Sequence, residues 1–259
     1  MMRVTILGCG GSSGVPIIGC ECAVCTSDDC RNKRLRSSVF LETSGGNILI
    51  DTTPDLRQQA LVNNITQVDH VLYTHAHADH IHGIDDTRAF NYRNNAPLPI
   101  YGDFQTLERL KMQFDYAFSS PVEQAGWYRP SLQANEIKSG VEFKLCGVDI
   151  TPFEQSHGRA GKSIGYKIGN FAYSTDVKEL SDEALTLLSG IDCWVVDCLA
   201  YEEAPTHAHL ERTLSWIEKV KPKRAILTHM SHGLDYNVLR AELPDGTEPA
   251  FDNMIIANL

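Results

Sequence analysis

The sequence predicts a single domain of the α/β class, and three observations lead to this prediction. Short apolar runs, each ending at glycine or at a polar residue, recur along the whole chain with helical patterns between them. The chain has 259 residues, of which 42% are hydrophobic, and this is enough for an extensive buried core. No linker rich in proline, glycine or serine divides it. We therefore expect one domain over residues 1–259.

The first half is expected to begin with a strand at 3–7 that breaks at Gly8 and enters a glycine-rich turn. Amides of this turn, beside Ser12, could approach a bound anion, although a tight strand connection explains the glycines about as well. The other elements expected in this half are hairpin strands at 38–42 and 47–50, strands at 70–73 and 97–101, and helices at 55–63 and 104–116.

The second half is expected to start with a loop at 118–132 whose aromatic residues cover the functional site. Ser181 begins a capping pattern typical of a helix start. The elements expected here are strands at 143–153, with a turn at 146–147, and at 171–175, 193–197 and 224–228, and helices at 181–188 and 210–220.

The strand at 70–73 leads into a dense group of candidate metal ligands. Three histidines and one aspartate fall within six residues, at His75, His77, Asp79 and His80. In an extended segment His75 and His77 point the same way, whereas the adjacent Asp79 and His80 must point elsewhere. Imidazole and carboxylate are ligands that divalent zinc, manganese or iron accept. The spacing predicts two metals side by side, one for each pair, against the alternative of a polar surface loop.

The segment His75-Ala76-His77-Ala78-Asp79-His80 resembles the HxHxDH signature of the metallo-β-lactamase superfamily. This resemblance implies a four-layered αββα sandwich. It also implies three further ligands at strand ends, for which the sequence offers His157, Asp176 and His229 in the required order. One metal would then be held by His75, His77 and His157, and the other by Asp79, His80 and His229, with Asp176 between them. A water shared by two divalent ions, zinc or manganese, is the expected nucleophile of a hydrolysis reaction, and two-metal sites suit phosphate esters.

A second metal site is predicted in a cysteine-rich loop. Cys20, Cys22 and Cys25 fall within six residues, and a closed structural zinc site needs a fourth ligand from elsewhere. Cys30 is close in sequence, but His232 is the preferred candidate because it would tie this loop to the turn that carries His229. A disulfide and free thiols are the alternatives. Because the first residues form a strand rather than a signal peptide, we expect a cytoplasmic protein, in which disulfides are rare.

Further residues are assigned roles around the predicted centre. Asp51 is expected either to orient the metal-binding loop or to cap the turn before Pro54. Arg88 could bind a substrate phosphate or form a surface ion pair. His207 is the preferred proton donor to a leaving group and a contact for a phosphoryl oxygen. The candidate catalytic residues are His207 and Asp79, and His209 is the alternative to His207. The candidate substrate-binding residues are Ser12, Arg88 and His207.

Over nearly the whole chain, the cysteine loop, the glycine turn and the spacing of His207 and His229 resemble the phosphodiesterases of the carbon-phosphorus lyase pathway, which hydrolyse a cyclic ribose phosphate. The chain is also similar to transfer-RNA 3′ processing nucleases, but its net charge of −10 disfavours a long nucleic acid. We expect a small, cyclic ribose or nucleotide phosphodiester as substrate, no membrane, and a homodimer as a possible assembly. The alternatives are an acyl hydrolase, such as a thioesterase or lactonase, and a non-hydrolytic relative similar to the pyrroloquinoline quinone biosynthesis protein.

Overall fold

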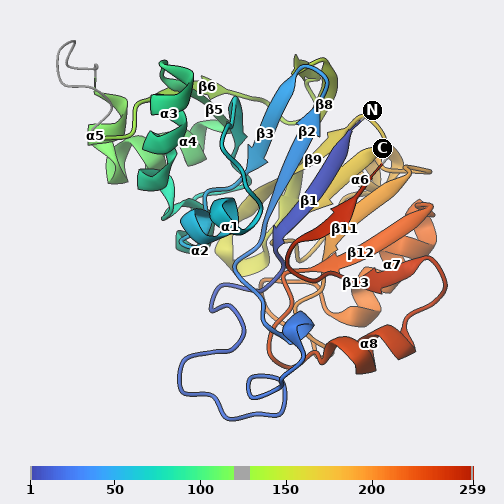
Figure 1. The fold of residues 1–259 in the computed structure, drawn as a ribbon. Helices are drawn as coiled ribbons and strands as arrows, with labels where there is room; N and C mark the ends of the chain where they lie inside the picture. The colour runs from blue at the N-terminus through green and yellow to red at the C-terminus, as the bar shows by residue number, and fades with distance from the viewer. Residues whose placement is uncertain (1, 120–128, 258) are drawn as a thin grey trace.

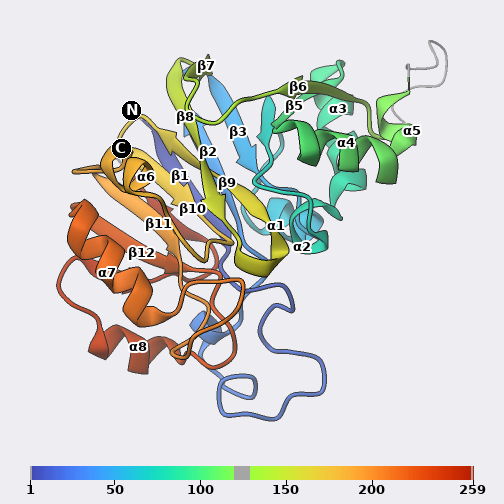
Figure 2. The same ribbon diagram turned by 180° about the vertical axis from the view of Figure 1, so that it is seen from behind.

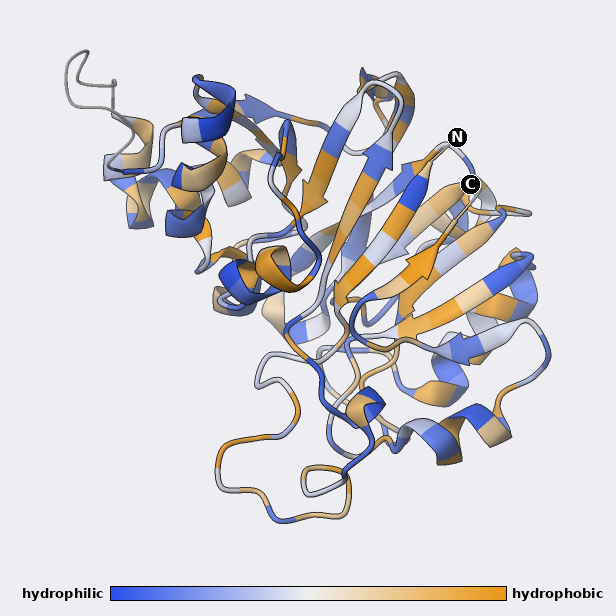
Figure 3. Ribbon diagram, viewed as in Figure 1, coloured by the Kyte–Doolittle hydropathy of each residue, from blue (hydrophilic) through white to orange (hydrophobic). Residues whose placement is uncertain are grey.

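The computed structural model describes residues 2–119, 129–257 and 259, and it places two seven-stranded β-sheets between outer layers of helices (Figures 1 and 2). Hydrophobic residues concentrate on the strands, which form the inner layers (Figure 3). This arrangement confirms the four-layered αββα sandwich that the histidine motif implied. The expectation for a covering loop at 118–132 falls largely on residues 120–128, which lie outside the described residues.

The first sheet is built from the N-terminal half of the chain and one strand from the C-terminal end. Its β1, β2 and β14 pair antiparallel, while β3, β4, β5 and β6 are parallel neighbours. In sheet order the strands are β14 (Met254–Ile256), β1 (Arg3–Gly8), β2 (Ser38–Thr43), β3 (Gly46–Ile50), β4 (His70–Leu72), β5 (Leu98–Gly102) and β6 (Leu132–Glu136).

The second sheet is built from the C-terminal half. Its β7, β8, β9 and β10 are joined antiparallel, and β10, β11, β12 and β13 run parallel. In sheet order the strands are β13 (Thr247–Pro249), β12 (Arg224–Thr228), β11 (Cys193–Asp197), β10 (Phe171–Ser174), β9 (Lys162–Ile168), β8 (Val148–Ser156) and β7 (Phe143–Leu145).

The helices cover the outer faces of the two sheets (Figures 1 and 2). Those on the first sheet are α1 (Leu56–Val62), α2 (Ala78–Ile81), α3 (Arg88–Asn94), α4 (Phe104–Gln113) and α5 (Asp115–Phe118). Those beside the second sheet are α6 (Asp182–Leu187), α7 (Leu210–Val220) and α8 (Tyr236–Glu242). Short 3-10 turns lie at Cys30–Asn32, Ile84–Thr87 and Gly158–Ala160. None of the helices in the described part of the chain has the length and hydrophobicity needed to cross a bilayer.

Two apolar cores hold the layers together. The larger core lies between the sheets, where Val4 and Leu41 of the first sheet join Phe153 and Val195 of the second in one buried cluster. The smaller core lies between the first sheet and its helices, and it contains Leu107 of α4. Because strands buried on both faces carry continuous apolar runs, the sequence pattern located most of them.

The C-terminal ends of several strands lie at one edge of the sandwich. In the first sheet β3 and β4 run parallel, so the residues that follow them leave at the same edge. In the second sheet β10, β11 and β12 run parallel, and β8 has the same direction because β9 is antiparallel to both β8 and β10. This edge is where residues distant in sequence are brought together.

Several elements differ from the expectations. The helix expected at 104–116 is divided at Phe114, which separates α4 from α5. The sequence pattern did not predict α3, α8, the strands β6 and β9, or the edge strands β13 and β14. Each of these elements has only three to seven residues, so its hydrophobic periodicity is weak.

Candidate metal centre

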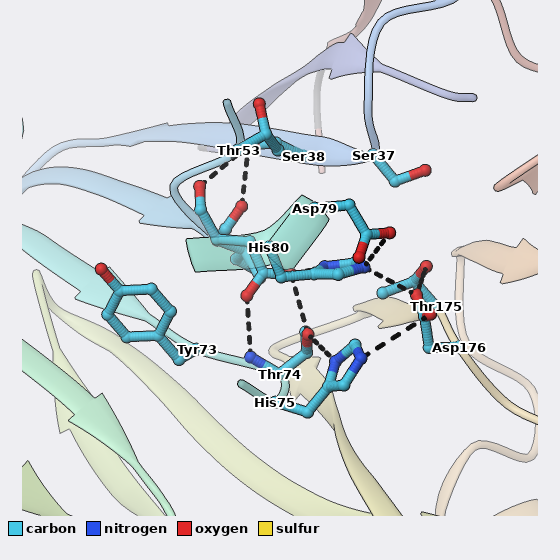
Figure 4. Close-up of polar contacts among 12 residues, drawn as sticks. Ser37, Ser38, Thr53, Tyr73, Thr74, His75, Asp79, His80, Thr175 and Asp176 are labelled. Atoms are coloured by element: carbon cyan, nitrogen blue, oxygen red, sulfur yellow. Dashed lines mark hydrogen bonds and ion pairs between the residues drawn. The ribbon is translucent and has the colours of Figure 1, made fainter. Parts of the chain in front are cut away.

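The histidine-rich segment follows β4 directly and turns into α2. His75 and His77 lie in the extended part before the helix, whereas Asp79 and His80 lie in its first turns. The ring of His75 is 4.3 Å from that of His77 and 4.4 Å from that of His80, measured between ring centroids. The segment therefore holds its four candidate ligands around one point, as Figure 4 shows for His75, Asp79 and His80.

Three more candidate ligands reach the same point from the second sheet. His157 follows β8, Asp176 lies two residues after β10, and His229 follows β12. The seven side chains form two groups, and in each group the potential ligand atoms all lie within 4.8 Å of one another. One group is His75, His77, His157 and Asp176, and the other is Asp79, His80, Asp176 and His229.

Asp176 belongs to both groups and divides its two oxygens between them. Its Oδ1 lies 3.8 Å from Nε2 of His75 and 3.6 Å from Nε2 of His157. Its Oδ2 lies 3.1 Å from Nε2 of His80. The carboxylate of Asp176 therefore faces both groups of candidate ligands.

The polar atoms that face the centre fit divalent metal ions. Five buried atoms there have no hydrogen-bond partner within the described residues: Nε2 of His75, His80 and His229, Oδ2 of Asp79 and Oδ1 of Asp176. Leaving a buried polar atom unsatisfied costs about 1–3 kcal/mol. Five such atoms converging on one point are therefore typical of a site that binds cations, and imidazole with carboxylate is a donor set that zinc and manganese accept.

Asp51 orients two of the histidines from the side that faces away from the centre. Its Oδ2 accepts a hydrogen bond from Nδ1 of His80 at 2.7 Å and another from the Thr74 hydroxyl at 2.8 Å. Because the Thr74 hydroxyl donates to Asp51, it accepts from Nδ1 of His75, 3.0 Å away. Both histidines are thereby fixed with Nε2 turned toward the centre (Figure 4).

His157 and His229 are fixed in the same manner. Nδ1 of His157 lies 2.8 Å from the carbonyl oxygen of Thr206, which can only accept, so the proton is on Nδ1. Nε2 of His157 carries no proton and lies 3.3 Å from Nδ1 of His77. Nδ1 of His229 lies 3.2 Å from the hydroxyl of Thr175, which itself donates to Asp176. Four of the histidines thus present the same nitrogen to the centre.

Electrostatics keep most of these histidines neutral. Burial lowers the pKa of His75, His157 and His229 below the usual range, and the neutral form is the one that binds metal. His80 differs, because the carboxylates of Asp176, Asp79 and Asp51 outweigh the effect of burial and raise its pKa. A proton on His80 and a divalent cation therefore compete for the same negative surroundings.

Three residues of the site have left-handed backbones one or two residues after a strand. The φ angles are 65° at Asp51, 55° at Asp176 and 59° at His229. This region costs a residue other than glycine about 1–3 kcal/mol, and such conformations occur where the surrounding structure enforces them. The sharp turn at each strand end aims the side chain into the space between the sheets.

His207 lies against the metal-ligand candidates, with a partner of its own. Its ring stacks on His229 at 4.7 Å and meets His157 edge-on at 4.8 Å. Its Nδ1 bonds to Oδ2 of Asp197 at 2.9 Å. Burial lowers the pKa of His207, but the Asp197 carboxylate outweighs burial and raises it to about 9. The contact with Asp197 therefore favours the protonated form of His207.

The other candidates are placed less centrally. His209 is the N-cap residue of α7 and is not part of the histidine ring cluster. Ser12 is exposed in the turn after β1, where the neighbouring Gly11 passes beside the His229 ring. Arg88 starts α3 and lines a hollow with α1 residues that contains none of the seven candidate ligands. The structure brings His207, but neither His209 nor Arg88, to the centre.

The predicted cysteine site is also assembled. Sγ of Cys20 and Sγ of Cys22 lie 3.3 and 3.4 Å from Nδ1 of His232, and Cys25 completes a group whose ligand atoms are all within 4.8 Å. Three thiols and one imidazole match the tetrahedral set of a structural zinc. A backbone hydrogen bond from Cys25, with help from His232, lowers the pKa of Cys22 to about 6, which favours the thiolate that binds metal. Cys30 is exposed and is not in the group.

Arg34 anchors the turn that carries His232. This side chain is only 1% exposed. Its guanidinium donates to the carbonyl oxygens of Ser231 at 2.9 Å and Leu234 at 2.6 Å. The turn at 231–234 is therefore held by Arg34 from one side and by the cysteine loop from the other.

Sequence reasoning missed four groups that orient the site, namely Asp197, Thr74, the Thr206 carbonyl and the Thr175 hydroxyl. Asp197 was expected only as the last residue of a buried strand, and the carboxylate at that strand end is the signal that could have revealed it. Thr74 lies next to His75 but has no distinguishing pattern. The Thr206 contact uses a backbone carbonyl, which any residue has.

Comparisons with known proteins agree with this geometry. Residues 46–230 match the family model described as Beta-lactamase superfamily domain. A crystal structure described as a new diphosphatase from the PhnP family has a TM-score of 0.92 and 35% identity, and the match covers 100% of this chain and 98% of that one. Zn²⁺-bound PqqB from Methylobacterium extorquens has a TM-score of 0.80 at 17% identity, covering 99% and 100% of the two chains, so that likeness concerns the fold alone.

Two curated relatives match over part of their length. An octanoyltransferase of Porphyromonas gingivalis is 36% identical over 234 residues, which are 89% of this chain and 46% of that protein. Coenzyme PQQ synthesis protein B of Methylobacterium radiotolerans is 30% identical over 115 residues, 39% of this chain and 37% of that protein. The chain thus spans less than half the length of these relatives.

Proposed function

The chain belongs to the beta-lactamase superfamily of metal-dependent hydrolases, and from this premise we propose that it hydrolyses small phosphodiesters. The observation that carries the proposal is Asp176, whose two oxygens face two separate groups of histidine and carboxylate ligands. Paired metal sites of this kind occur in phosphatases and nucleases, where two ions stabilise the attacking and leaving oxygens of a phosphoryl group.

The residues that would hold two divalent ions, zinc or manganese, are the seven members of the two groups. When bound, such ions lower the pKa of a water molecule and stabilise negative charge on the phosphoryl oxygens. Other residues of the chain hold the side chains of these candidate ligands in a fixed orientation. Asp51, Thr74, Thr206 and Thr175 bond to Nδ1 of the histidines, directly or through one hydroxyl, so that Nε2 faces the substrate side.

His207 would give a proton to the leaving oxygen. It lies against His157 and His229, and Asp197 holds its Nδ1 proton, so that Nε2 is directed toward Asp176 at 3.9 Å. With a pKa near 9 it carries the proton that an alkoxide leaving group needs. Asp197 acts through His207 by orienting it and keeping it charged.

A phosphoryl substrate is favoured over an acyl substrate by the similarity to the PhnP-family diphosphatase, which extends over both complete chains. The relative named octanoyltransferase makes acyl-ester hydrolysis the second candidate, but this chain covers only 46% of that protein. The net charge of −10 favours a small substrate over a long nucleic acid, because a polyanion is bound through basic surfaces.

The test compares two reactions of one metal-loaded preparation, namely turnover of bis(p-nitrophenyl) phosphate and of an acyl thioester, each before and after treatment with a chelator. We expect chelator-sensitive hydrolysis of the phosphodiester. Asp176→Ala should abolish it, whereas His82→Ala, an exposed histidine next to α2 that is outside both groups, should not. Hydrolysis of the thioester alone would replace the proposal by the acyl reaction.

A further inference from the structure

The segment that carries Asp176 leaves its sheet just before it reaches the centre. The pairing of β10 with β9 stops at Tyr173, and its pairing with β11 stops at Ser174. Thr175 and Asp176 therefore lie beyond the ladder, although both residues are buried. A buried backbone carbonyl needs a hydrogen-bond donor, so these two carbonyl groups must find donors other than a neighbouring strand.

Two side chains on the adjacent strands supply these donors. Nε2 of Gln155, in β8, donates to the carbonyl oxygen of Thr175 at 3.0 Å. Oγ of Ser163, in β9, donates to the carbonyl oxygen of Asp176 at 2.9 Å. Gln155 and Ser163 are cross-strand partners, and the same Nε2 also donates to the serine hydroxyl at 3.1 Å. Each of the two side chains is only 1% exposed.

The chemistry of the acceptors fixes the direction of these hydrogen bonds. A backbone carbonyl can only accept, so the amide nitrogen of Gln155 faces Thr175 and the hydroxyl proton of Ser163 faces Asp176. The hydroxyl oxygen is then free to accept the second amide proton of Gln155. Gly165 leaves room for this amide, because a Cβ at that position would lie 2.6 Å from Oε1 of Gln155. The bonds therefore run in one direction, from Gln155 to the backbone around Asp176.

These bonds hold the two peptide planes that flank the Cα atom of Asp176. The carbonyl of Thr175 belongs to the plane before it, and the carbonyl of Asp176 belongs to the plane after it. The second plane is held at its other end too, because the N–H of Val177 donates to Oδ2 of Asp197 at 2.9 Å. The rotations of these two planes are φ and ψ of residue 176, and its φ is the left-handed 55°. The direction of the Asp176 side chain follows from these two angles.

β9 also bonds to the segment that leads into the histidine motif of the other sheet. The N–H of Ile164, next to Ser163, donates to the carbonyl oxygen of Thr74 at 2.8 Å. Thr74 precedes His75, whose ring faces Asp176 (Figure 4). Nε2 of His75 lies 3.8 Å from Oδ1 of that carboxylate. Adjacent residues of one strand are thus bonded to the two backbone segments that meet at the centre.

We propose that Gln155 and Ser163 are positioning residues of the cation sites, which fix the backbone at Asp176 so that its two oxygens face the two groups of candidate ligands. The inference rests on the two-cation centre of the proposed function and does not depend on the substrate. Neither side chain belongs to a ligand group, so both act through Asp176. Removing either donor leaves a buried carbonyl unpaired and frees one of the peptide planes that aim the shared carboxylate.

The test measures the binding of Mn²⁺ to the metal-free chain by calorimetry, without any substrate. Manganese is the suitable probe because carboxylate and imidazole accept it, whereas the thiols of the cysteine loop select zinc. Gln155→Met keeps nearly the same side-chain length, and Ser163→Ala removes only the hydroxyl. Each variant should weaken Mn²⁺ binding about 10- to 100-fold, the effect of losing an outer partner of a metal ligand. Ser163→Thr retains the hydroxyl and should recover most of the affinity.

The matched control is Asn91→Leu in α3. Asn91 is fully buried, and its Nδ2 likewise donates to two backbone carbonyls, those of Ala96 at 2.9 Å and Ser131 at 2.8 Å. It belongs to neither ligand group. Both Gln155→Met and Asn91→Leu should lower the melting temperature of the metal-free chain, because each leaves carbonyls without a donor. Only Gln155→Met should lower the affinity for Mn²⁺.

The outcomes distinguish positioning from a purely structural role. Native Mn²⁺ affinity in both Gln155→Met and Ser163→Ala would assign these side chains to folding stability alone and overturn the inference. An equal loss of affinity in Asn91→Leu would overturn it as well, because affinity would then follow stability. Binding by Ser163→Thr that is as weak as that by Ser163→Ala would show that packing, and not the hydroxyl, matters.

The same measurements separate this inference from the proposed function. A native chain that binds Mn²⁺ and loses affinity in the two variants, but hydrolyses no phosphodiester, would overturn the phosphodiesterase and leave the positioning role in place. A native chain that hydrolyses the phosphodiester, with unchanged Mn²⁺ affinity in both variants, would give the opposite result.

Discussion

Nδ1 of His207 lies 2.9 Å from Oδ2 of Asp197, and the same imidazole stacks on His229 at 4.7 Å. This pairing joins the end of β11 to the segment before α7, beside the metal-ligand candidates. The side chain of His207 is only 7% exposed, which suits the proton donor that we propose better than it suits a capping histidine on the surface.

His207→Ala should lower turnover of a diester with a poor leaving group about a hundredfold, the low end of general acid catalysis. Metal content should not change, because His207 belongs to neither group of candidate ligands. Steady-state kinetics with metal analysis by mass spectrometry provides the check. A p-nitrophenolate leaving group needs less protonation, so its turnover should fall less, and an equal fall for both would argue against proton donation.

The dependence of kcat on pH should show the effect of Asp197 on the pKa of His207. With the pKa of His207 near 9, kcat for the poor leaving group should decline as the pH rises through about 9, because the proton is lost. Asp197→Asn removes the charge that raises this pKa, so the alkaline decline should move to lower pH. A profile that is identical in the variant would show that another group controls the alkaline limb.

Asp51→Asn should weaken metal binding about 10- to 100-fold, the usual effect of losing the partner of a ligating histidine. The substitution keeps the size of a side chain that is fully buried and that bonds to both His80 and Thr74. Competition with a fluorescent chelator measures the affinity. The matched control is Asp69→Asn, a partly buried aspartate whose contacts lie on Asn47 and Gln67. Native affinity in Asp51→Asn would remove the orienting role.

Cys22→Ala should act on stability, because a closed zinc site contributes to the folding free energy. We expect one fewer tightly held zinc per chain and a lower melting temperature, with activity retained at temperatures where the chain is folded. Cys30→Ala is the comparison, since Cys30 is exposed and outside the ligand group. Loss of activity in Cys22→Ala with unchanged melting would contradict a structural role.

Asp252 should make stability depend on pH. Burial raises the pKa of this carboxyl to about 7, above the value of about 3.9 expected in the unfolded chain. The native state therefore binds the proton more tightly, and its contribution to stability is complete below about pH 4 and is lost as the pH rises through about 7. Asp252→Asn should flatten the fall in the free energy of unfolding between pH 5 and 8. The exposed Asp245→Asn should keep the native slope, measured by denaturant titration at each pH.

The sequence predicted most strands and the ligands of the histidine motif because both depend on local patterns, whereas the layers and the ligands His157, Asp176 and His229 followed from the resemblance to the metallo-β-lactamase superfamily. The apolar strands and the spacing of His75 to His80 are visible without coordinates, and His232 could be chosen because it adjoins His229. The domain boundaries and the individual roles of the site residues stay predictions. Arg88 illustrates what sequence position cannot provide: it lies close to the motif along the chain, but α3 turns it to a different hollow. Arg109 lies farther along the chain, yet α4 brings it to a hollow that His75 and His77 also line.

The backbone at Asp51, Asp176 and His229 has a further consequence for the evolution of this chain. All three positions hold a main-chain geometry that glycine adopts freely and other residues adopt at a cost. Glycine would relieve this backbone cost, but each exchange would also remove a candidate cation ligand or the Asp51 carboxylate that orients two of them. A substitution that relaxes the main chain at these strand ends is therefore one that the proposed function would not tolerate.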